Sequence, residues 1–402
     1  MDSATDAPGA GAGQGFRGVR RPRPVRVPRK GCGAVRIGLL VGSGNPSFGG
    51  VEQHVIHLAN GLTALGHTAF VLMGSPCPIN AEHGLRPDVE QFRVPVPDGG
   101  SLPRFLTTGL GVLRRRRPDV LHSHLTYALV LGVLARAVLG RPVVHTEHFV
   151  VRKSADRGLR GEAGALLRGR ADALIGVSRL VTAECPVLGG RPARYTIYNG
   201  TVPAPLRTSP SPPGRLLYVG RLEPDKRVEV VLEVVRRLRD QGYTLDIVGT
   251  GSLEERLRGG CKDLENAGVV RWHGWQSDVR PFLREAGALV QPAREGLGYA
   301  ALEAAAHGVP LVVPAASGAS EVVGMTRYGV VIEADSDVGA WVSAVQELSG
   351  LPMRPQPLPG VFRVEQMVAS TVGVYQALAS TPDRIHPGPT PAAARPPARL
   401  RG

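Results

Sequence analysis

The feature that most constrains the fold is an alternation of short apolar segments with amphipathic helical segments, which occurs twice along the chain. The apolar segments are rich in valine, leucine and isoleucine, which is typical of parallel strands covered on both faces. The expected strands of the first half are 35–41, 68–73, 119–124, 142–148, 173–178 and 195–200. Those of the second half are 215–220, 244–249, 269–274, 288–292, 310–314 and 329–333. This pattern predicts an α/β protein with two doubly wound parallel-sheet domains.

Composition places the boundaries of these domains. In chain order the expected parts are a basic tail (1–33), an N-terminal Rossmann-like domain (34–200), a proline-rich linker (201–213), a C-terminal Rossmann-like domain (214–360), a terminal helix (361–380) and a second tail (381–402). Both tails are rich in glycine, proline, alanine and arginine, so they cannot build a core and are expected to be disordered. We expect the two domains to face each other across a cleft.

The net charge of +14 lies mostly in the tails. Residues 1–33 carry seven Lys or Arg and two Asp, giving +5, and residues 381–402 carry four Arg and one Asp, giving +3. Subtracting both leaves +6 for the body, which has no groove-reading motif for nucleic acid. We therefore expect no nucleic-acid partner, although a protein that binds nucleic acid or a membrane surface through its tails stays an alternative.

The remaining composition indicates a cytoplasmic protein. No apolar run approaches the roughly 18–20 residues of a membrane span, and no apolar segment follows the basic N-terminus as in a secretory signal. The four cysteines are far apart and form no metal-type pair. The run Arg114–Arg117 ends an expected helix, where cations complement the helix dipole. Peripheral contact of this run with the inner membrane face is a second interpretation.

Two glutamates in the segment EGLGYAALE are the strongest functional signal. Glu295 directly follows an expected strand, and Glu303 lies on the second turn of the helix expected at 299–307. Ligands of open α/β sheets bind at the carboxyl ends of the strands, where a helix N-terminus attracts phosphate. Carboxylates beside such an anion site are suited to bind the neutral hydroxyls of a sugar or ribose. The alternative is an exposed loop acid and an ordinary helix acid.

Two cations are expected at the same rim. Arg221 and Lys226 follow the first strand of the second domain. Such a pair can hold a diphosphate and stabilise it as a leaving group. The alternative is a pair of solvated surface charges.

Glycines crowd the first turn of the N-terminal domain. Gly42 and Gly44 begin like a dinucleotide fingerprint, but Ser47 stands in place of its third glycine, and no acid follows the second strand to bind a ribose. A nicotinamide cofactor is therefore disfavoured. The amides of Gly49 and Gly50 are expected to approach a phosphate held by the other domain.

Histidines cluster at the ends of two strands of the first half. His122 and His124 lie on the same side of their strand, and His145, Glu147 and His148 end the next one. These residue types can bind a metal, but no motif with metal-ligand spacing supports it, so we expect no metal site. We expect His124 at the cleft rim, where it accepts hydrogen bonds from a substrate, and His122 and His145 in the core.

These motifs, in this order, resemble the retaining glycosyltransferases of family four, which have the GT-B fold. The matching segments include FGGVEQHVIHLANGLTALGH (48–67), PDVLHSH (118–124), VGRLEPDKRVEVVLEVVRRL (219–238) and EGLGYAALEAAAHGVPLVV (295–313). The resemblance implies a nucleoside-diphosphate sugar of the UDP or GDP type as co-substrate, a small-molecule or lipid-linked acceptor, and no metal or other cofactor.

The resemblance also implies roles for individual residues. Glu303 would bind the ribose hydroxyls, Glu295 the transferred sugar, and His124 the sugar near its reacting carbon. Arg221 and Lys226 would bind the diphosphate, helped by backbone amides. The implied donor-binding set is Gly49, Gly50, Arg221, Lys226, Glu295, Gly296, Leu297, Gly298 and Glu303. The resemblance makes 34–200 the acceptor domain and 214–360 the nucleotide-sugar donor domain, and the terminal helix would cross back to the first of them.

Three positions depart from the family pattern. Arg227 stands where glycine is usual, Thr201–Val202 replaces an apolar residue and aspartate, and Gly318–Ala319 replaces two glycines. The implied activity is metal-independent transfer of a sugar, with retention of configuration, to an acceptor hydroxyl. The enzyme alternatives are a phosphorylase of the same fold and a nucleotide-sugar epimerase.

Overall fold

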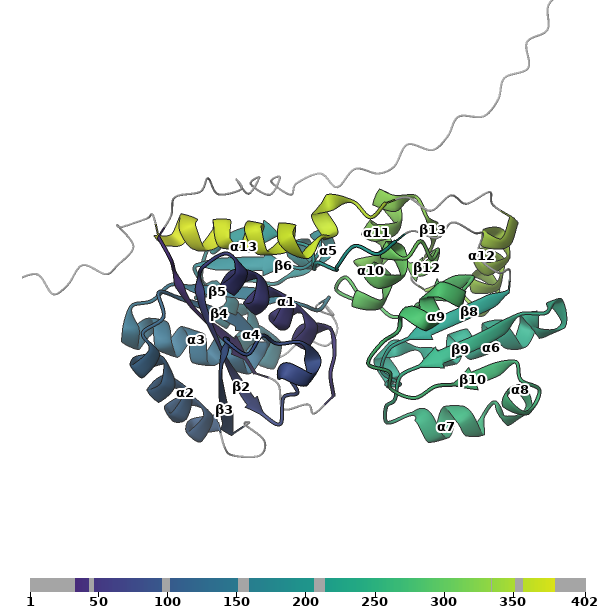
Figure 1. The fold of residues 1–402 in the computed structure, drawn as a ribbon, viewed down its shortest axis with the longest axis horizontal. Coiled ribbons are helices and arrows are strands. Elements are labelled where there is room, and N and C mark those ends of the chain that lie inside the picture. Colours follow the sequence, from purple (N-terminus) through teal and green to yellow (C-terminus); the bar gives the residue numbers. More distant parts are fainter. Residues whose placement is uncertain are drawn as a thin grey trace, which may run out of the picture.

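The structure is a computed structural model, which describes residues 33–42, 47–95, 102–150, 159–205, 214–333, 335–350 and 357–379. Two α/β domains lie side by side, the first drawn in purple to teal and the second mostly in green (Figure 1). The expected tails, apart from Gly33, fall outside the described residues, as do Gly44 and most of the proline-rich linker.

The N-terminal sheet has seven parallel strands in the order β3-β2-β1-β4-β5-β6-β7. The strands are β1 (Arg36–Val41), β2 (Thr68–Ser75), β3 (Glu90–Pro95), β4 (Val120–His124), β5 (Val143–Glu147), β6 (Ala173–Gly176) and β7 (Ala193–Thr196). The sequence did not predict β3, whose polar residues lie at an exposed sheet edge. The strand expected at 195–200 also begins and ends earlier, because the chain leaves the sheet after Thr196.

The C-terminal sheet has six parallel strands in the order β10-β9-β8-β11-β12-β13. The strands are β8 (Arg215–Val219), β9 (Thr244–Val248), β10 (Val270–Trp272), β11 (Ala288–Val290), β12 (Leu311–Pro314) and β13 (Gly329–Ile332). In both sheets the chain order reverses beside the first strand of the domain, so a crevice opens at the carboxyl ends there. The predicted fold class, two doubly wound parallel-sheet domains, is confirmed.

Helices cover both faces of each sheet. The first domain contains α1 (Gly50–Ala64), α2 (Leu102–Arg116), α3 (Thr126–Leu139), α4 (Leu159–Gly169), α5 (Arg179–Glu184) and the 3₁₀ turn η1 (Ala81–His83). The second contains η2 (Pro224–Lys226), α6 (Val228–Leu238), η3 (Arg239–Gln241), α7 (Glu254–Gly259), α8 (Lys262–Asn266), α9 (Arg280–Glu285), α10 (Tyr299–Ala306), α11 (Ala319–Thr326) and α12 (Val338–Gly350). None of the helices in the described ranges is both long and apolar enough to cross a bilayer.

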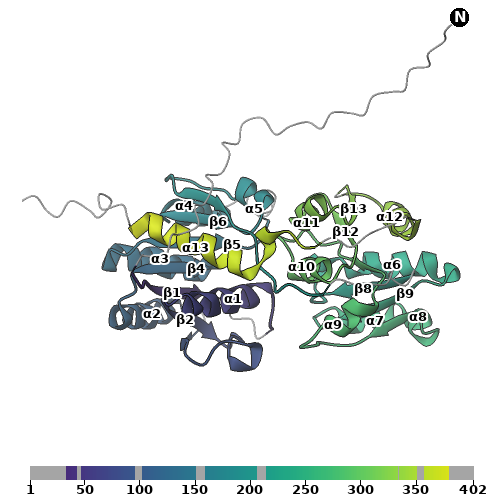
Figure 2. The ribbon, with the colours of Figure 1, turned by 45° about the horizontal axis from the view of Figure 1, so that its top comes forward.

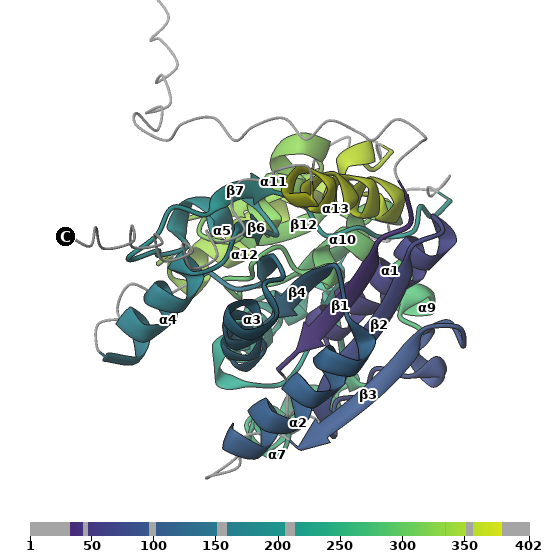
Figure 3. The same ribbon diagram turned by 90° about the vertical axis from the view of Figure 1, so that its left-hand side faces the viewer.

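The last helix, α13 (Val364–Ala379), follows the turn η4 (Gly360–Phe362) and lies on the first domain, beside α1 (Figures 2 and 3). Val368 and Val372 belong to the N-terminal core, and a Cβ added at Gly61 of α1 would come within 2.4 Å of Val368. The two interdomain segments touch where the amide of Thr201 donates to the carbonyl oxygen of Phe362 at 2.8 Å. Chain segments distant in sequence thus form the connection together.

Candidate active site

A cavity of about 610 Å³ lies between the carboxyl ends of the two sheets and is lined by residues of both domains. It contains every residue of the expected donor-binding set: Gly49, Gly50, Arg221, Lys226, Glu295, Gly296, Leu297, Gly298 and Glu303. His124 is the one expected site residue that does not line it. Residues up to 254 positions apart, from Gly49 to Glu303, therefore line one cavity.

Lys226 and Glu295 form a buried ion pair inside this cavity. Lys226 Nζ lies 2.7 Å from Glu295 Oε1 and 3.2 Å from Asp225 Oδ2. Lys226 is only 9% exposed, although a lysine usually reaches solvent. The ion pair fixes the ammonium at the cavity wall and orients the carboxylate of Glu295 beside it. A phosphate oxygen and a sugar hydroxyl could be bound side by side at this pair.

Arg221 supplies a second cation on the same rim. Its backbone is fixed by the hydroxyl of Tyr218, which donates to the Arg221 carbonyl oxygen at 2.9 Å. Within the described parts of the chain, no carboxylate lies within ion-pair distance of the Arg221 guanidinium. The guanidinium is therefore able to bind an anion without first breaking an internal ion pair.

Glu303 joins the two domains across the cavity. Gln53 of α1 donates from Nε2 to Glu303 Oε1 at 2.8 Å. Burial raises the pKa of Glu303, whereas the hydrogen bond from Gln53 acts to lower it. Among the residues that the structure describes, Glu303 Oε2 accepts no hydrogen bond, so it is able to accept one from a ligand. Gln53 had no predicted role, and its place one turn into α1, just after Gly49–Gly50, is the signal that could have found it.

Glycines allow the loop that carries Glu295 to approach its neighbours closely. A Cβ added at Gly296 would lie 1.9 Å from the carbonyl oxygen of His148 in the other domain, and one at Gly318 would lie 1.8 Å from that of Gly296. Gly298 adopts a φ of 83°, which favours glycine, directly before α10. Backbone packing against the first domain thus fixes the start of α10.

The histidines divide into partnered core residues and a group beside the cavity. His122 Nδ1 lies 2.6 Å from the Tyr375 hydroxyl and His122 Nε2 lies 2.7 Å from the Thr146 hydroxyl. Both ring nitrogens are thus hydrogen-bonded, which is typical of a histidine in a protein core. His124 is fully buried rather than at the rim, and the next residue, Leu125, lines the cavity instead. The reason is that His124 lies on a fully buried strand, where its side chain packs against His122 with ring centroids 4.4 Å apart.

Three imidazoles meet behind the cavity wall. One nitrogen each of His54, His124 and His148 lies within 4.8 Å of the others, so this group has ligand types that could hold a metal. His124 Nδ1 contacts His148 Nε2 at 3.0 Å, and His54 Nδ1 contacts Asn199 Oδ1 at 2.9 Å. Burial lowers the pKa of all three, so they are neutral at pH 7. Of the three, His148 lines the cavity, and His54 was not predicted.

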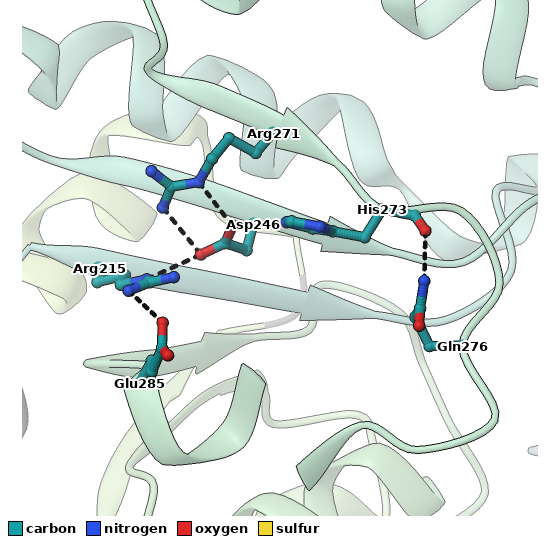
Figure 4. Close-up of polar contacts among 6 residues, drawn as sticks. All are labelled: Arg215, Asp246, Arg271, His273, Gln276 and Glu285. Atoms are coloured by element: carbon teal, nitrogen blue, oxygen red, sulfur yellow. Dashed lines mark hydrogen bonds and ion pairs between the residues drawn. The ribbon is translucent and has the colours of Figure 1, made fainter. Parts of the chain in front are cut away.

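A second network of polar contacts, in the second domain, is centred on Asp246 (Figure 4). Asp246 of β9 is 3% exposed and accepts hydrogen bonds from Arg215, Arg271 and His273. Burial acts to raise the pKa of Asp246, but these hydrogen bonds outweigh it and hold the pKa well below its ordinary value. The His273 carbonyl oxygen accepts from Gln276 Nε2 at 2.7 Å, and Gln276 lines the cavity. Asp246 therefore anchors one end of the loop that contains Trp275 and Gln276.

The three departures from the family pattern leave the cavity intact. Arg227 keeps the left-handed conformation, with φ 54° and ψ 40°, at a position where glycine is usual, and it thereby stores strain before α6. Thr201 forms an isolated bridge with Arg363 in the interdomain connection. Ala319 is buried in α11 and does not line the cavity, so it does not narrow it.

Both halves of the chain match known families. Residues 48–203 match glycosyltransferase family 4, and residues 207–356 match the glycosyl transferases group 1. The chain is 30% identical over 379 residues to the phosphatidyl-myo-inositol mannosyltransferase of Mycolicibacterium smegmatis, covering 88% of this chain and 89% of that protein. It is 29% identical to a glycogen synthase of Mycobacterium tuberculosis, covering 82% of this chain and 91% of that protein.

Solved structures show the same fold. Sucrose-phosphate synthase from Thermosynechococcus elongatus has a TM-score of 0.70 at 19% identity, over 86% of this chain and 99% of that one. Anabaena HepE, solved with UDP and glucose, has a TM-score of 0.66 at 19% identity, over 86% of this chain and 98% of that one. Fold, family and cavity agree: the protein is a glycosyltransferase that belongs to family 4 and has the GT-B fold.

Proposed function

We propose that this glycosyltransferase moves a sugar from a nucleoside-diphosphate sugar to an acceptor hydroxyl with retention of configuration, without a divalent metal at the diphosphate. The observation that carries the proposal is the Lys226–Glu295 ion pair, which joins a predicted phosphate ligand and a predicted sugar ligand in one cavity. Arg221 on the same rim brings a second positive charge to the position where a diphosphate would leave.

In this mechanism the protein does the work usually given to a metal ion. Lys226, Arg221 and the free amides at the N-termini of α1 and α10 neutralise charge that develops on the departing phosphate. Glu303 binds the ribose hydroxyls and Glu295 those of the transferred sugar. The acceptor oxygen attacks from the face that the nucleotide leaves, and its proton passes to the departing phosphate oxygen.

Turnover of Lys226→Ala and Glu295→Ala tests the proposal, with a panel of UDP- and GDP-sugars as donors. Because each variant loses a contact to the charge that develops or to the reacting sugar, we expect turnover to fall about 100- to 1000-fold. Lys262→Ala, an exposed lysine of α8 outside the cavity, is the matched control and should keep full activity. Near-native turnover in both cavity variants would overturn the proposal.

Two further measurements test the metal independence and the stereochemistry of the proposed reaction. Activity should survive extensive treatment with EDTA, since no step at the diphosphate uses a metal. The anomeric configuration of the product, followed by NMR, should equal that of the donor. An inverted product would exclude the retaining mechanism and leave the assignment of the donor residues intact.

A further inference from the structure

A second cavity, of about 270 Å³, adjoins the first and is lined by first-domain residues alone. Leu125 and Phe149 line both cavities, so the two meet at these side chains. His148, next to Phe149, packs its carbonyl oxygen against Gly296, which follows Glu295. The junction of the two cavities therefore lies next to the loop that is proposed to bind the transferred sugar.

An ion pair with one unused donor lines the second cavity. Arg168 of α4 donates from Nε to Glu147 Oε2 at 2.9 Å, and both side chains are only 11–12% exposed. Arg168 Nη1 is buried and has no hydrogen-bond partner among the described residues. A buried donor without a partner is costly in a folded protein, so a ligand group that accepts from Nη1 would be favoured. The pair offers a donor and a carboxylate acceptor side by side.

Aromatic side chains also border the second cavity. Tyr127 is 42% exposed and Phe149 is 47% exposed, although large aromatic side chains are usually more buried. Leu125 at the junction has φ 71° and ψ 162°, a region that is nearly restricted to glycine. Such strain persists chiefly where function requires it, and here it sets the wall between the two cavities.

We propose that the second cavity binds the acceptor and that the acceptor group it recognises is one neutral polyhydroxylated ring, such as a sugar or a cyclitol. Neighbouring ring hydroxyls would accept from Arg168 Nη1 and donate to Glu147, while Tyr127 and Phe149 contact the apolar C–H face. The charge of Arg168 is already balanced by Glu147, so the site favours a neutral group over an anionic one. At about 270 Å³ the cavity is smaller than the typical 300–1,000 Å³ of drug-sized ligand sites, which suits a single ring.

This inference rests on the proposed function. A hydroxyl of the bound ring, at the junction near Leu125, would form the new bond to the anomeric carbon of the donor as the bond from that carbon to the phosphate oxygen breaks. The hydroxyl proton goes to the departing phosphate oxygen, so the products are the glycoside and the nucleoside diphosphate. No further reactant is needed.

The test compares transfer with acceptor-free hydrolysis of the donor. The probes are glucose, maltose and myo-inositol as neutral acceptors and glucose 6-phosphate as an anionic one. The variants are Tyr127→Ala, which removes the aromatic face, and Gly164→Val, whose added side chain would project towards Arg168. A Cβ at Gly164 meets Arg168 Nη1 at 3.4 Å, an ordinary contact, so this substitution should fold. Leu166→Ala, an exposed position of α4 outside the cavity, is the control.

We expect a neutral probe to accelerate nucleotide release. Both variants should raise the KM for that acceptor about tenfold, the effect of losing one good contact, and lower the ratio of transfer to hydrolysis. The control should change neither. An unchanged acceptor KM in both variants, or acceleration by glucose 6-phosphate alone, would overturn the inference while hydrolysis still supports the donor site. Failure of the wild-type protein to release nucleotide from any donor would overturn the proposed function and this inference with it.

Discussion

The two domains bury ionisable side chains in opposite ways. In the second domain the carboxylate of Asp246 has hydrogen bonds from two arginines and a histidine. In the first domain five buried histidines gather near the ends of β4 and β5 and α1, with no carboxylate paired closely to most of them: His54, His122, His124, His145 and His148. His54 Nε2 and His124 Nε2 have no partner among the described residues.

This difference separates a charged network from a neutral one. Asp246 stays ionised in the core because its partners compensate its desolvation, and the loop with Gln276 is anchored as a result. The histidines stay neutral because burial lowers the pKa of each, to about 4 for His54 and about 3 for His145. The Asp246 network of the second domain should therefore be insensitive to mild acid. The histidine cluster of the first domain should lose stability in it.

Acidification is the largest expected effect. Below pH 6.5 the histidines bind protons in the unfolded chain but stay unprotonated in the folded one. The free energy of unfolding therefore falls as the pH drops from 6.5 towards their folded pKa values. At pH 5 this amounts to about 2 kcal/mol for each of His54 and His145. The lowered pKa values of His122, His124 and His148 act in the same direction, so the loss is a large part of the roughly 5–15 kcal/mol that stabilises a domain. We expect the first domain to lose hydrogen-exchange protection near pH 5 while the second keeps it.

Tryptophan fluorescence of a Trp275→Phe variant is a convenient control for this prediction, because Trp341 and Trp272 pack in the core of the second domain. Trp275 is removed because its ring faces His83 of the first domain, with ring centroids 6.3 Å apart. The signal of the two remaining tryptophans should stay native at a pH where peptides of the first domain exchange freely. Burial raises the pKa of Glu147, so its protonation in acid favours the folded state, in the opposite direction to the histidines. This is one carboxyl group, whereas five imidazoles act the other way. Simultaneous loss of protection in both domains would show that the contrast has no energetic consequence.

Removing the charge at the centre of the compensated network should have the next largest effect. Asp246→Asn leaves Arg271 without its carboxylate and Arg215 with Glu285 alone. Because both arginines also partly reach solvent, we expect a loss of about 2–3 kcal/mol in the free energy of unfolding. Urea denaturation measures it. Asp263→Asn, which breaks an exposed pair with Arg236, is the control and should change little. Wild-type stability in Asp246→Asn would contradict the anchoring role.

The smallest effect is expected from one buried histidine. His124→Leu removes a single hydrogen bond, to His148, so stability at pH 7.5 should change by about 1 kcal/mol or less. Because burial lowers the pKa of His124, the loss of stability between pH 6 and 5 should instead become less steep, by at most the share of one proton, about 1.4 kcal/mol per pH unit. Urea titrations at several pH values measure both quantities. An unchanged slope would mean that His124 is protonated in the folded protein.

The sequence predicted the fold because its apolar strands are buried on both faces, a signal that needs no tertiary information. It missed β3, whose glutamate, glutamine and arginine reflect an exposed edge. It placed Lys226 and Glu295 at the carboxyl-end edge of the same sheet, since the end of each apolar strand can be recognised in the sequence. It did not predict the hydrogen bond from Gln53 to Glu303, 250 residues away, because that contact depends on how the domains meet. The depth of His124 likewise depends on packing.

The position of α13 bears on how the chain is made. Val368, Val372 and Tyr375 complete the core of the first domain, and Tyr375 supplies a hydrogen-bond partner for His122. During translation the ribosome must finish the whole second domain before these side chains emerge. The nascent first domain therefore keeps an uncovered apolar face, which makes it a natural client for chaperones until α13 has been synthesised.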